Sequence, residues 1–126
     1  MNKPELLKSG RDLLLKLHKT LVDHERRVYE SINGTQTAAQ FLNVLLEDSD
    51  FAWLRKFSTL IVEIDEMFDL KEDLTVDMIN ANLQKVRELV EMTEPDDYFR
   101  AKYQFALQRD PNAAGLQSEL KSLLTK

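Results

Sequence analysis

The feature that most constrains the fold is an unbroken amphipathic segment near the start of the chain, PELLKSGRDLLLKLHKTLVDHERRVYESI, residues 4–32. At 100° per residue, one face of a helix collects its apolar and small side chains: Leu7, Gly10, Leu14, Leu17, Leu21, Val28 and Ile32. Pro4 suits the first turn of this helix, and Asn33-Gly34 suits its end. A helix of this length spans about 42 Å. Such a rod fits only a helical bundle, or a helix that projects from one.

The rest of the chain continues in helical segments. Thr37 suits the N-cap of a short helix, AAQFLNVLLE, and the cluster Asp48-Ser49-Asp50 ends it and caps the next one. Thr75 suits another N-cap, and Asp110-Pro111 separates the last two segments. No segment alternates as a strand does. The sequence therefore predicts an all-α protein, an up-and-down bundle of four main helices near residues 4–32, 51–69, 75–92 and 95–109 with two short extra helices.

Length and composition set the class of protein. A chain of 126 residues fits one helical-bundle domain, residues 1–126, that can bury its own core. The absence of Cys and the presence of only two His leave no disulfide or zinc site to support the fold. Residues 1–15 lack the apolar stretch of a signal peptide, and no apolar run long enough for a membrane follows. We therefore expect a cytoplasmic protein that does not enter a membrane.

The net charge of -5 is concentrated in the middle of the chain. Residues 63–97 carry three Lys or Arg against twelve Asp or Glu, whereas residues 1–62 carry nine against eight and residues 98–126 five against two. A nucleic-acid-binding protein needs clustered Lys and Arg to displace counterions from phosphates. This charge distribution predicts that nucleic acid is not a partner.

Three polar residues interrupt the apolar face of the first helix. Arg11, His18 and Glu25 are spaced by seven and lie on one line of the helix. An unpaired buried carboxylate is costly, so Glu25 is expected to meet a Tyr, Arg or His from a neighbouring helix in a structural network. The alternative is that these side chains form the polar floor of a small-molecule pocket. Asp65 lies on the flank of its helix where Arg11 or His18 can reach it.

The segment FAWLRKFSTLIVEIDE, residues 51–66, holds the only Trp and ends in three carboxylates. As a helix continued to residue 68 it has one wide apolar face, formed by Trp53, Leu54, Phe57, Leu60, Ile61, Ile64, Met67 and Phe68. Glu63 and Asp65 fall on opposite flanks of that face, so the carboxylates do not converge on a catalytic site. Trp53 is expected in the core, and an interface role in a partner's groove is the alternative.

The sequence contains no motif typical of a metal site or of a catalytic nucleophile. A carboxylate-bridged di-metal bundle uses Glu-x-x-His, but the residue three before His18 is Leu15, and three before His24 is Leu21. There is no Cys nucleophile and no Gly-rich turn that could hold a phosphate. The sequence predicts no catalytic residue, no metal and no cofactor.

Three segments together, LLKLHKTLVDHERRVYE, FAWLRKFSTLIVEIDE and FALQRDPNAAGLQSELKSLL, resemble a family of small all-helical bacterial proteins with no assigned activity. The resemblance spans most of the chain and is most specific from FAWLR to IDE. It implies a bacterial cytoplasmic protein and transfers no catalytic residue.

Two functional hypotheses follow. The first is a non-enzymatic helical bundle that binds a protein partner or forms a homodimer, because the long first helix extends beyond what the other helices can cover. The alternative is a small-molecule-binding or enzymatic bundle with a polar pocket around His18, Glu25 and Asp65, joined by Arg11.

Overall fold

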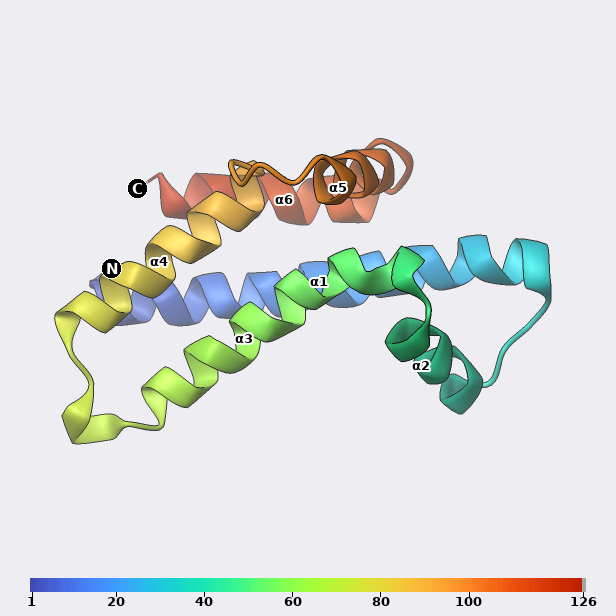
Figure 1. Ribbon diagram of the computed structural model, residues 1–126. Coiled ribbons are helices and arrows are strands. Elements are labelled where there is room, and N and C mark those ends of the chain that lie inside the picture. Colours follow the sequence, from blue (N-terminus) through green and yellow to red (C-terminus); the bar gives the residue numbers. More distant parts are fainter. Residues whose placement is uncertain (126) are drawn as a thin grey trace.

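The computed structural model describes residues 1–125, and every regular element in that range is helical (Figure 1). In chain order these are α1 (Lys3–Asn33), α2 (Ala38–Glu47), the 3-10 helix η1 (Ser49–Leu54), α3 (Arg55–Phe68), the 3-10 helix η2 (Lys71–Asp73), α4 (Val76–Glu91), α5 (Asp97–Arg109) and α6 (Pro111–Leu124). The all-α prediction is confirmed for these residues. None of these helices is both long and apolar enough to cross a membrane.

Local capping signals set the helix starts. The side chain of Asn2 accepts a hydrogen bond from the backbone N–H of Glu5 at 3.0 Å and begins α1. Thr37 and Gln40 form a capping box at the start of α2, in which each side chain binds the other residue's backbone N–H. Thr75 caps α4 in the same position. The predicted caps at Thr37 and Thr75 are confirmed.

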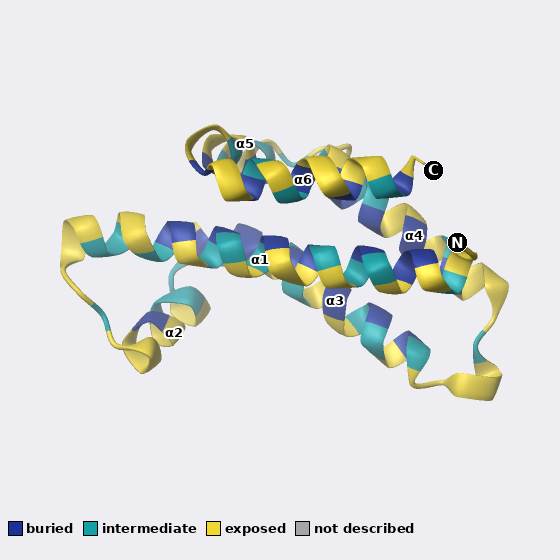
Figure 2. Cartoon of the chain, turned by 180° about the vertical axis from the view of Figure 1, so that it is seen from behind, coloured by how far each residue is buried: buried dark blue, intermediate teal, exposed yellow. Residues whose placement is uncertain are grey.

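The long helix α1 is the element around which the others pack. It contacts α6, α3, α4 and η1, and the buried hydrophobic side chains of all the α-helices and η1 belong to one cluster. In Figure 2 the buried residues recur as dark-blue stretches along α1. The apolar face predicted for α1 is buried from Leu7 to Leu21. The core is therefore arranged along α1 rather than around a central axis shared by four equal helices.

The end of α1 departs from this pattern. Val28 and Ile32 continue the predicted apolar face, but they are exposed, Ile32 to 79%. Figure 1 shows why, because the C-terminal end of α1 projects beyond α5 and α6 and only α2 and its connections lie near it. Val28 and Ile32 therefore lie on the predicted apolar face but stay exposed, because the other helices do not extend far enough along α1 to cover them.

The arrangement of four main helices is not confirmed. α6 has 14 residues against 13 in α5, and it packs along α1 and also contacts α4 and α5. In Figure 1, α6 runs across the page beside α1 whereas α5 is seen almost along its axis. Asp110 is the only residue between them and caps both, with the extended backbone that a following Pro favours. So short a connection makes a corner rather than an antiparallel hairpin.

Candidate functional site

Arg11 and Asp65 form an ion pair that joins α1 to α3. The Arg11 guanidinium donates two parallel hydrogen bonds to the Asp65 carboxylate, Nε to Oδ1 at 2.9 Å and Nη2 to Oδ2 at 2.8 Å. This pairing, first by hydrogen bonding and then by the charge of Asp65, raises the pKa of Arg11 above its ordinary value. Both carboxylate oxygens are already occupied, so this pair fastens two helices together.

His18 lies seven residues after Arg11 on the same line of α1, and its side chain is half-buried against the core. Its ring centroid is 6.3 Å from that of Phe57 in α3, with the two rings tilted by 34°. Burial lowers the pKa of His18 below its ordinary value. The imidazole is therefore neutral at pH 7 and packs as a ring against the aromatic core.

Glu25 is 5% exposed, the most deeply buried of the four predicted residues. Its partner is Lys102 of α5, whose Nζ lies 3.5 Å from Glu25 Oε2. Both side chains line a groove of about 370 Å³ between the end of α1, η1 and α5. The remaining residues of that lining are Val28, Tyr29, Ile32, Asn33, Asp48, Asp50 and Phe51. Glu25 therefore has a partner on a neighbouring helix, as predicted, but this partner is a lysine rather than a Tyr, Arg or His. Glu25 also lines a groove.

The structure does not bring the four predicted site residues together. Arg11 and Asp65 meet each other, whereas Glu25 lies 14 residues further along α1 than Arg11, about 21 Å of helix rise. His18 lies between these two positions and contacts Phe57. The prediction of a single pocket that uses His18, Glu25 and Asp65 is therefore wrong. Asp65 is bound to Arg11 near the N-terminal half of α1, whereas Glu25 lines a separate groove near its C-terminal end.

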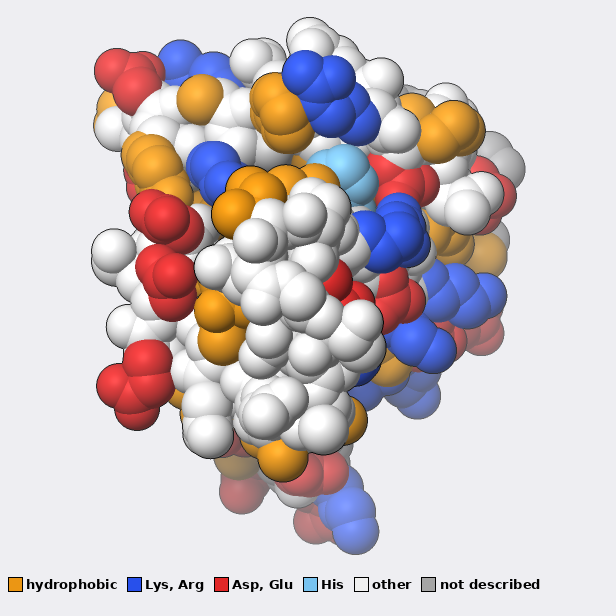
Figure 3. Space-filling model, turned by 90° about the vertical axis from the view of Figure 1, so that its right-hand side faces the viewer, with side chains coloured by type: hydrophobic (Ala, Val, Ile, Leu, Met, Phe, Trp, Pro, Cys, Tyr) orange, Lys and Arg blue, Asp and Glu red, His pale blue; other side chains and the backbone are white. Residues whose placement is uncertain are grey.

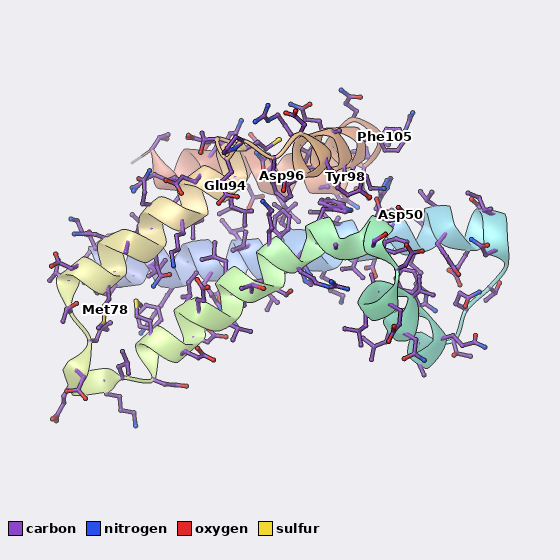
Figure 4. The ribbon with its side chains drawn as sticks, viewed as in Figure 1. Asp50, Met78, Glu94, Asp96, Tyr98 and Phe105 are labelled. Atoms are coloured by element: carbon purple, nitrogen blue, oxygen red, sulfur yellow. The ribbon has the colours of Figure 1, made fainter. Side chains whose placement is uncertain are left out.

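The rim of the groove carries groups that the sequence did not single out as functional. Tyr98 donates its hydroxyl hydrogen bond to the backbone oxygen of Asp50 at 3.0 Å, and Figure 4 shows the two residues close together between α5 and the start of η1. Burial, followed by the charges of Asp50, Glu25 and Asp48, raises the pKa of Tyr98. Asp48, Asp50 and Glu25 therefore produce a shared negative potential at this place.

A second buried polar group lies at the corner between α5 and α6. Asp110 is 4% exposed, accepts hydrogen bonds from the backbone N–H of Asn112 and Ala113, and binds Arg27 Nη2 at 2.8 Å. His24 Nδ1 is 3.9 Å from the same carboxylate. This cluster could not be predicted from local sequence, because Arg27 and Asp110 lie 83 residues apart. Asp110 binds the backbone at the start of α6 and the side chain of Arg27 on α1, so its role is structural.

Trp53 is a core residue. Only 2% of it is exposed, and its ring packs within about 6 Å of Phe57, Phe99 and Tyr103. The interface role offered as an alternative for Trp53 is therefore wrong, because the aromatic side chains of α3 and α5 enclose the ring.

The short helix α2 carries two large exposed apolar side chains. Phe41 is the one fully buried residue of this helix, packed edge-on against Phe51 and tilted against Tyr29. Leu42 and Leu46 are 54% and 60% exposed. Figure 2 shows α2 mostly in the colour of exposed residues, and on the face in Figure 3 the hydrophobic side chains form separate small groups among charged ones.

Among residues 1–125, no group of three or more His, Asp or Glu side chains is placed to hold a metal ion. Compared with models of protein families, with curated proteins and with solved structures, the chain matches none.

Proposed function

We propose that this protein is a non-enzymatic binding module that associates with a second protein chain through α2, and that a second copy of itself is the partner. The observation that carries the proposal is the exposed apolar face of α2. This helix has one charged residue, Glu47, and apolar side chains around most of its circumference. Only the edge that bears Phe41 packs on the rest of the molecule.

The total exposed area of the chain is consistent with a surface that a second chain could cover. The chain exposes 7598 Å², about one-tenth more than the roughly 6,900 Å² expected for a compact monomer of 14.7 kDa. The end of α1 projects beyond α5 and α6, and α2 lies beside it (Figure 1). A face that remains exposed on a projecting element is available to another chain.

The sequence of α2 favours an antiparallel pair about a two-fold axis. With Leu42 of both copies at the axis, Leu46 of one copy lies opposite Ala38 of the other, so a large side chain meets a small one. The two Glu47 carboxylates come at opposite ends of the pair, where they do not repel each other.

The contact is small, and we expect weak association. α2 is about 15 Å long, and its exposed face is well below the roughly 800 Å² per partner of a standard interface. A dissociation constant in the range of about 10–100 µM is consistent with such an area. Exchange between free and paired chains is therefore fast, which suits a reversible contact.

The ion pairs between helices favour a structural use of these charges over a catalytic one. The close charged pairs between helices join elements to each other, as Arg11 joins α1 to α3 and Lys56 of α3 binds Glu94 and Asp96, both at 2.9 Å. Figure 4 shows Glu94 and Asp96 at the turn between α4 and α5. Charges used in this way hold the turn in place.

Sedimentation velocity over a concentration series tests the proposal. Wild-type protein should shift from monomer to dimer with rising concentration, and Leu42→Glu should remain monomeric because it places two carboxylates at the two-fold axis. Val62→Glu is the matched control, since Val62 on α3 is 52% exposed and the charge change is identical. A wild-type chain that stays monomeric at millimolar concentration, or a dimer that survives Leu42→Glu, would contradict self-association through α2.

A further inference from the structure

Asn82 of α4 carries a buried hydrogen-bond acceptor without a partner. The residue is 8% exposed, and its side-chain oxygen Oδ1 has no hydrogen-bond partner among residues 1–125. The orientation of the amide is fixed, because Nδ2 donates to the backbone oxygen of Met78 at 3.3 Å and a reversed amide would bring two oxygens together. A buried acceptor in this state is unfavourable, so a group that donates to it gains more than an ordinary hydrogen bond.

The same residue lines a groove of about 420 Å³ between α3 and α4. The other walls of this groove are mainly apolar, with Met67 and Leu70 at the end of α3 and Met78 and Ala81 on α4. Figure 4 shows Met78 at the start of α4, near the turn that connects α3 to α4. A buried acceptor without a partner and an apolar groove therefore coincide at Asn82.

Two methionines control access to the amide. Met67 Sδ lies 3.1 Å from Asn82 Nδ2, and Asn82 Oδ1 is covered in this conformation. Because Met67 and Met78 are unbranched and flexible, and Met78 is 38% exposed, their side chains can move aside for a ligand. A water molecule fits this place poorly, since a buried water needs about two to four polar partners and the neighbouring walls are apolar.

An ion pair limits the length of the groove. Lys85 Nζ of α4 lies 3.2 Å from Glu63 Oε2 of α3, and these two residues line both this groove and a second one toward Thr59, so the pair separates the two. From Lys85 back to Met78 the helix rises about 10.5 Å, which suits a ring-sized molecule rather than a peptide that runs through. With Glu66, the carboxylates at the rim outnumber the ammonium and disfavour an anionic ligand.

We propose that this groove binds a small neutral aromatic molecule with one N–H donor, of the indole class. The ring lies between Met67 and Met78, whose thioethers make favourable contacts with aromatic rings, and the N–H donates to Asn82 Oδ1. The donor is neutral, because a charge among these apolar walls would lose its hydration without an opposite charge to replace it. The site uses α3 and α4 and not the exposed face of α2, so it stands independently of self-association.

Nuclear magnetic resonance titration of the full chain with indole tests the site. The matched ligand is 1-methylindole, in which a methyl group replaces the hydrogen that Asn82 would accept. We expect saturable binding of indole with a dissociation constant of about 1 mM, and about tenfold weaker binding of 1-methylindole. The side-chain amide signal of Asn82 should shift with indole, whereas that of Asn112, exposed on α6, should not. Equal binding of the two ligands, or no saturable binding of indole, would overturn the proposal.

Asn82→Leu removes the acceptor and keeps a side chain of similar size. Both ligands should then bind about equally, and the variant should fold because it removes a buried group without a partner. Gln84→Leu is the control, since Gln84 is exposed on the same helix and loses the same amide group. A preference for indole that survives Asn82→Leu, or that Gln84→Leu abolishes equally, would contradict the site. If Asn82→Leu does not fold, the Asn82 signal of the wild type decides, and an equal shift with 1-methylindole would overturn the proposal.

N-acetyl-tryptophan amide separates a free ligand from a Trp side chain of another protein. It carries the same ring on a peptide-like backbone, which the limited length of the groove does not accommodate. We therefore expect it to bind more weakly than indole. Tighter binding of this derivative would assign the groove to a Trp side chain of a partner protein and overturn the small-molecule proposal.

Discussion

His18 illustrates how one residue can interrupt an apolar face without forming a functional site. Its ring packs near Phe57, and the surroundings that exclude water from it also lower its pKa. Placing a charge there would cost desolvation, and no acidic side chain is a cause of its shift. His18 is therefore a packed neutral ring whose protonation opposes folding.

The lowered pKa of His18 predicts a pH dependence of stability. Above the ordinary pKa of about 6.5 the ring is neutral in both states, and His18 adds no pH dependence. As the pH falls below that value, the unfolded chain takes up a proton that the folded chain does not, so the free energy of unfolding decreases until the pH passes the folded pKa. Urea unfolding between about pH 7.5 and pH 5 should therefore show a steeper loss for wild type than for His18→Gln. Parallel curves for the two proteins would contradict a lowered pKa.

Glu25 and Arg11 show how far single residues could be predicted. Their position on the buried side of α1 follows from helical spacing, and the flank of Asp65 indicated correctly that it can reach Arg11. The partner of Glu25 could not be predicted, because Lys102 lies 77 residues away, on a helix whose direction no local pattern defines. The Asp48-Ser49-Asp50 cluster was visible as a turn, but its place beside Glu25 depends on that same packing.

At the scale of elements, α2 is attached by a few specific contacts. Arg55 at the start of α3 donates to the backbone oxygens of Leu45 and Leu46 at 3.2 and 2.6 Å, where α2 ends. Arg26 of α1 donates to the backbone oxygen of Gln36 at 2.6 Å in the loop before α2. A helix held in this way can open locally without unfolding the core.

Arg55→Met tests this attachment. The variant keeps the apolar stem of the side chain but leaves the last carbonyls of α2 without a charged donor, which removes about 1–1.5 kcal/mol from the local opening free energy. Amide hydrogens of residues 38–47 should then exchange roughly tenfold faster, with little change elsewhere. Arg109→Met is the control, because Arg109 stacks on Phe105 at 3.9 Å in α5. Unchanged exchange in α2, or faster exchange throughout the chain, would contradict this account.

The helices themselves were largely predictable, whereas their directions were not. Caps at Thr37 and Thr75 are read from neighbouring residues and were placed correctly. The corner at Asp110 and the packing of α6 along α1 depend on contacts between distant parts of the chain. Gly115 lowers the helix propensity of α6, but burial of Gln117 and Leu120 offsets this and keeps the helix long.

At the scale of the whole molecule, the buried hydrophobic residues form one continuous core along α1 from Leu6 to Leu21. Trp53 packs with aromatic side chains of α3 and α5, whereas α4 and α6 contribute apolar residues to the same cluster beside α1. A continuous core of this kind predicts that the helices unfold together rather than as separate halves.

Trp53 provides the test, because it is the only Trp and is 2% exposed. Urea unfolding followed by Trp53 fluorescence and by far-UV circular dichroism should give coincident curves. Leu83→Ala empties a buried position in α4 and should lower the free energy of unfolding by about 2–4 kcal/mol, with the same shift in both signals. Val62→Ala at an exposed position should change it by less than about 0.5 kcal/mol. If Leu83→Ala shifted the circular dichroism curve while leaving the Trp53 curve in place, α4 would unfold separately from the aromatic cluster, and a single cooperative core would be excluded.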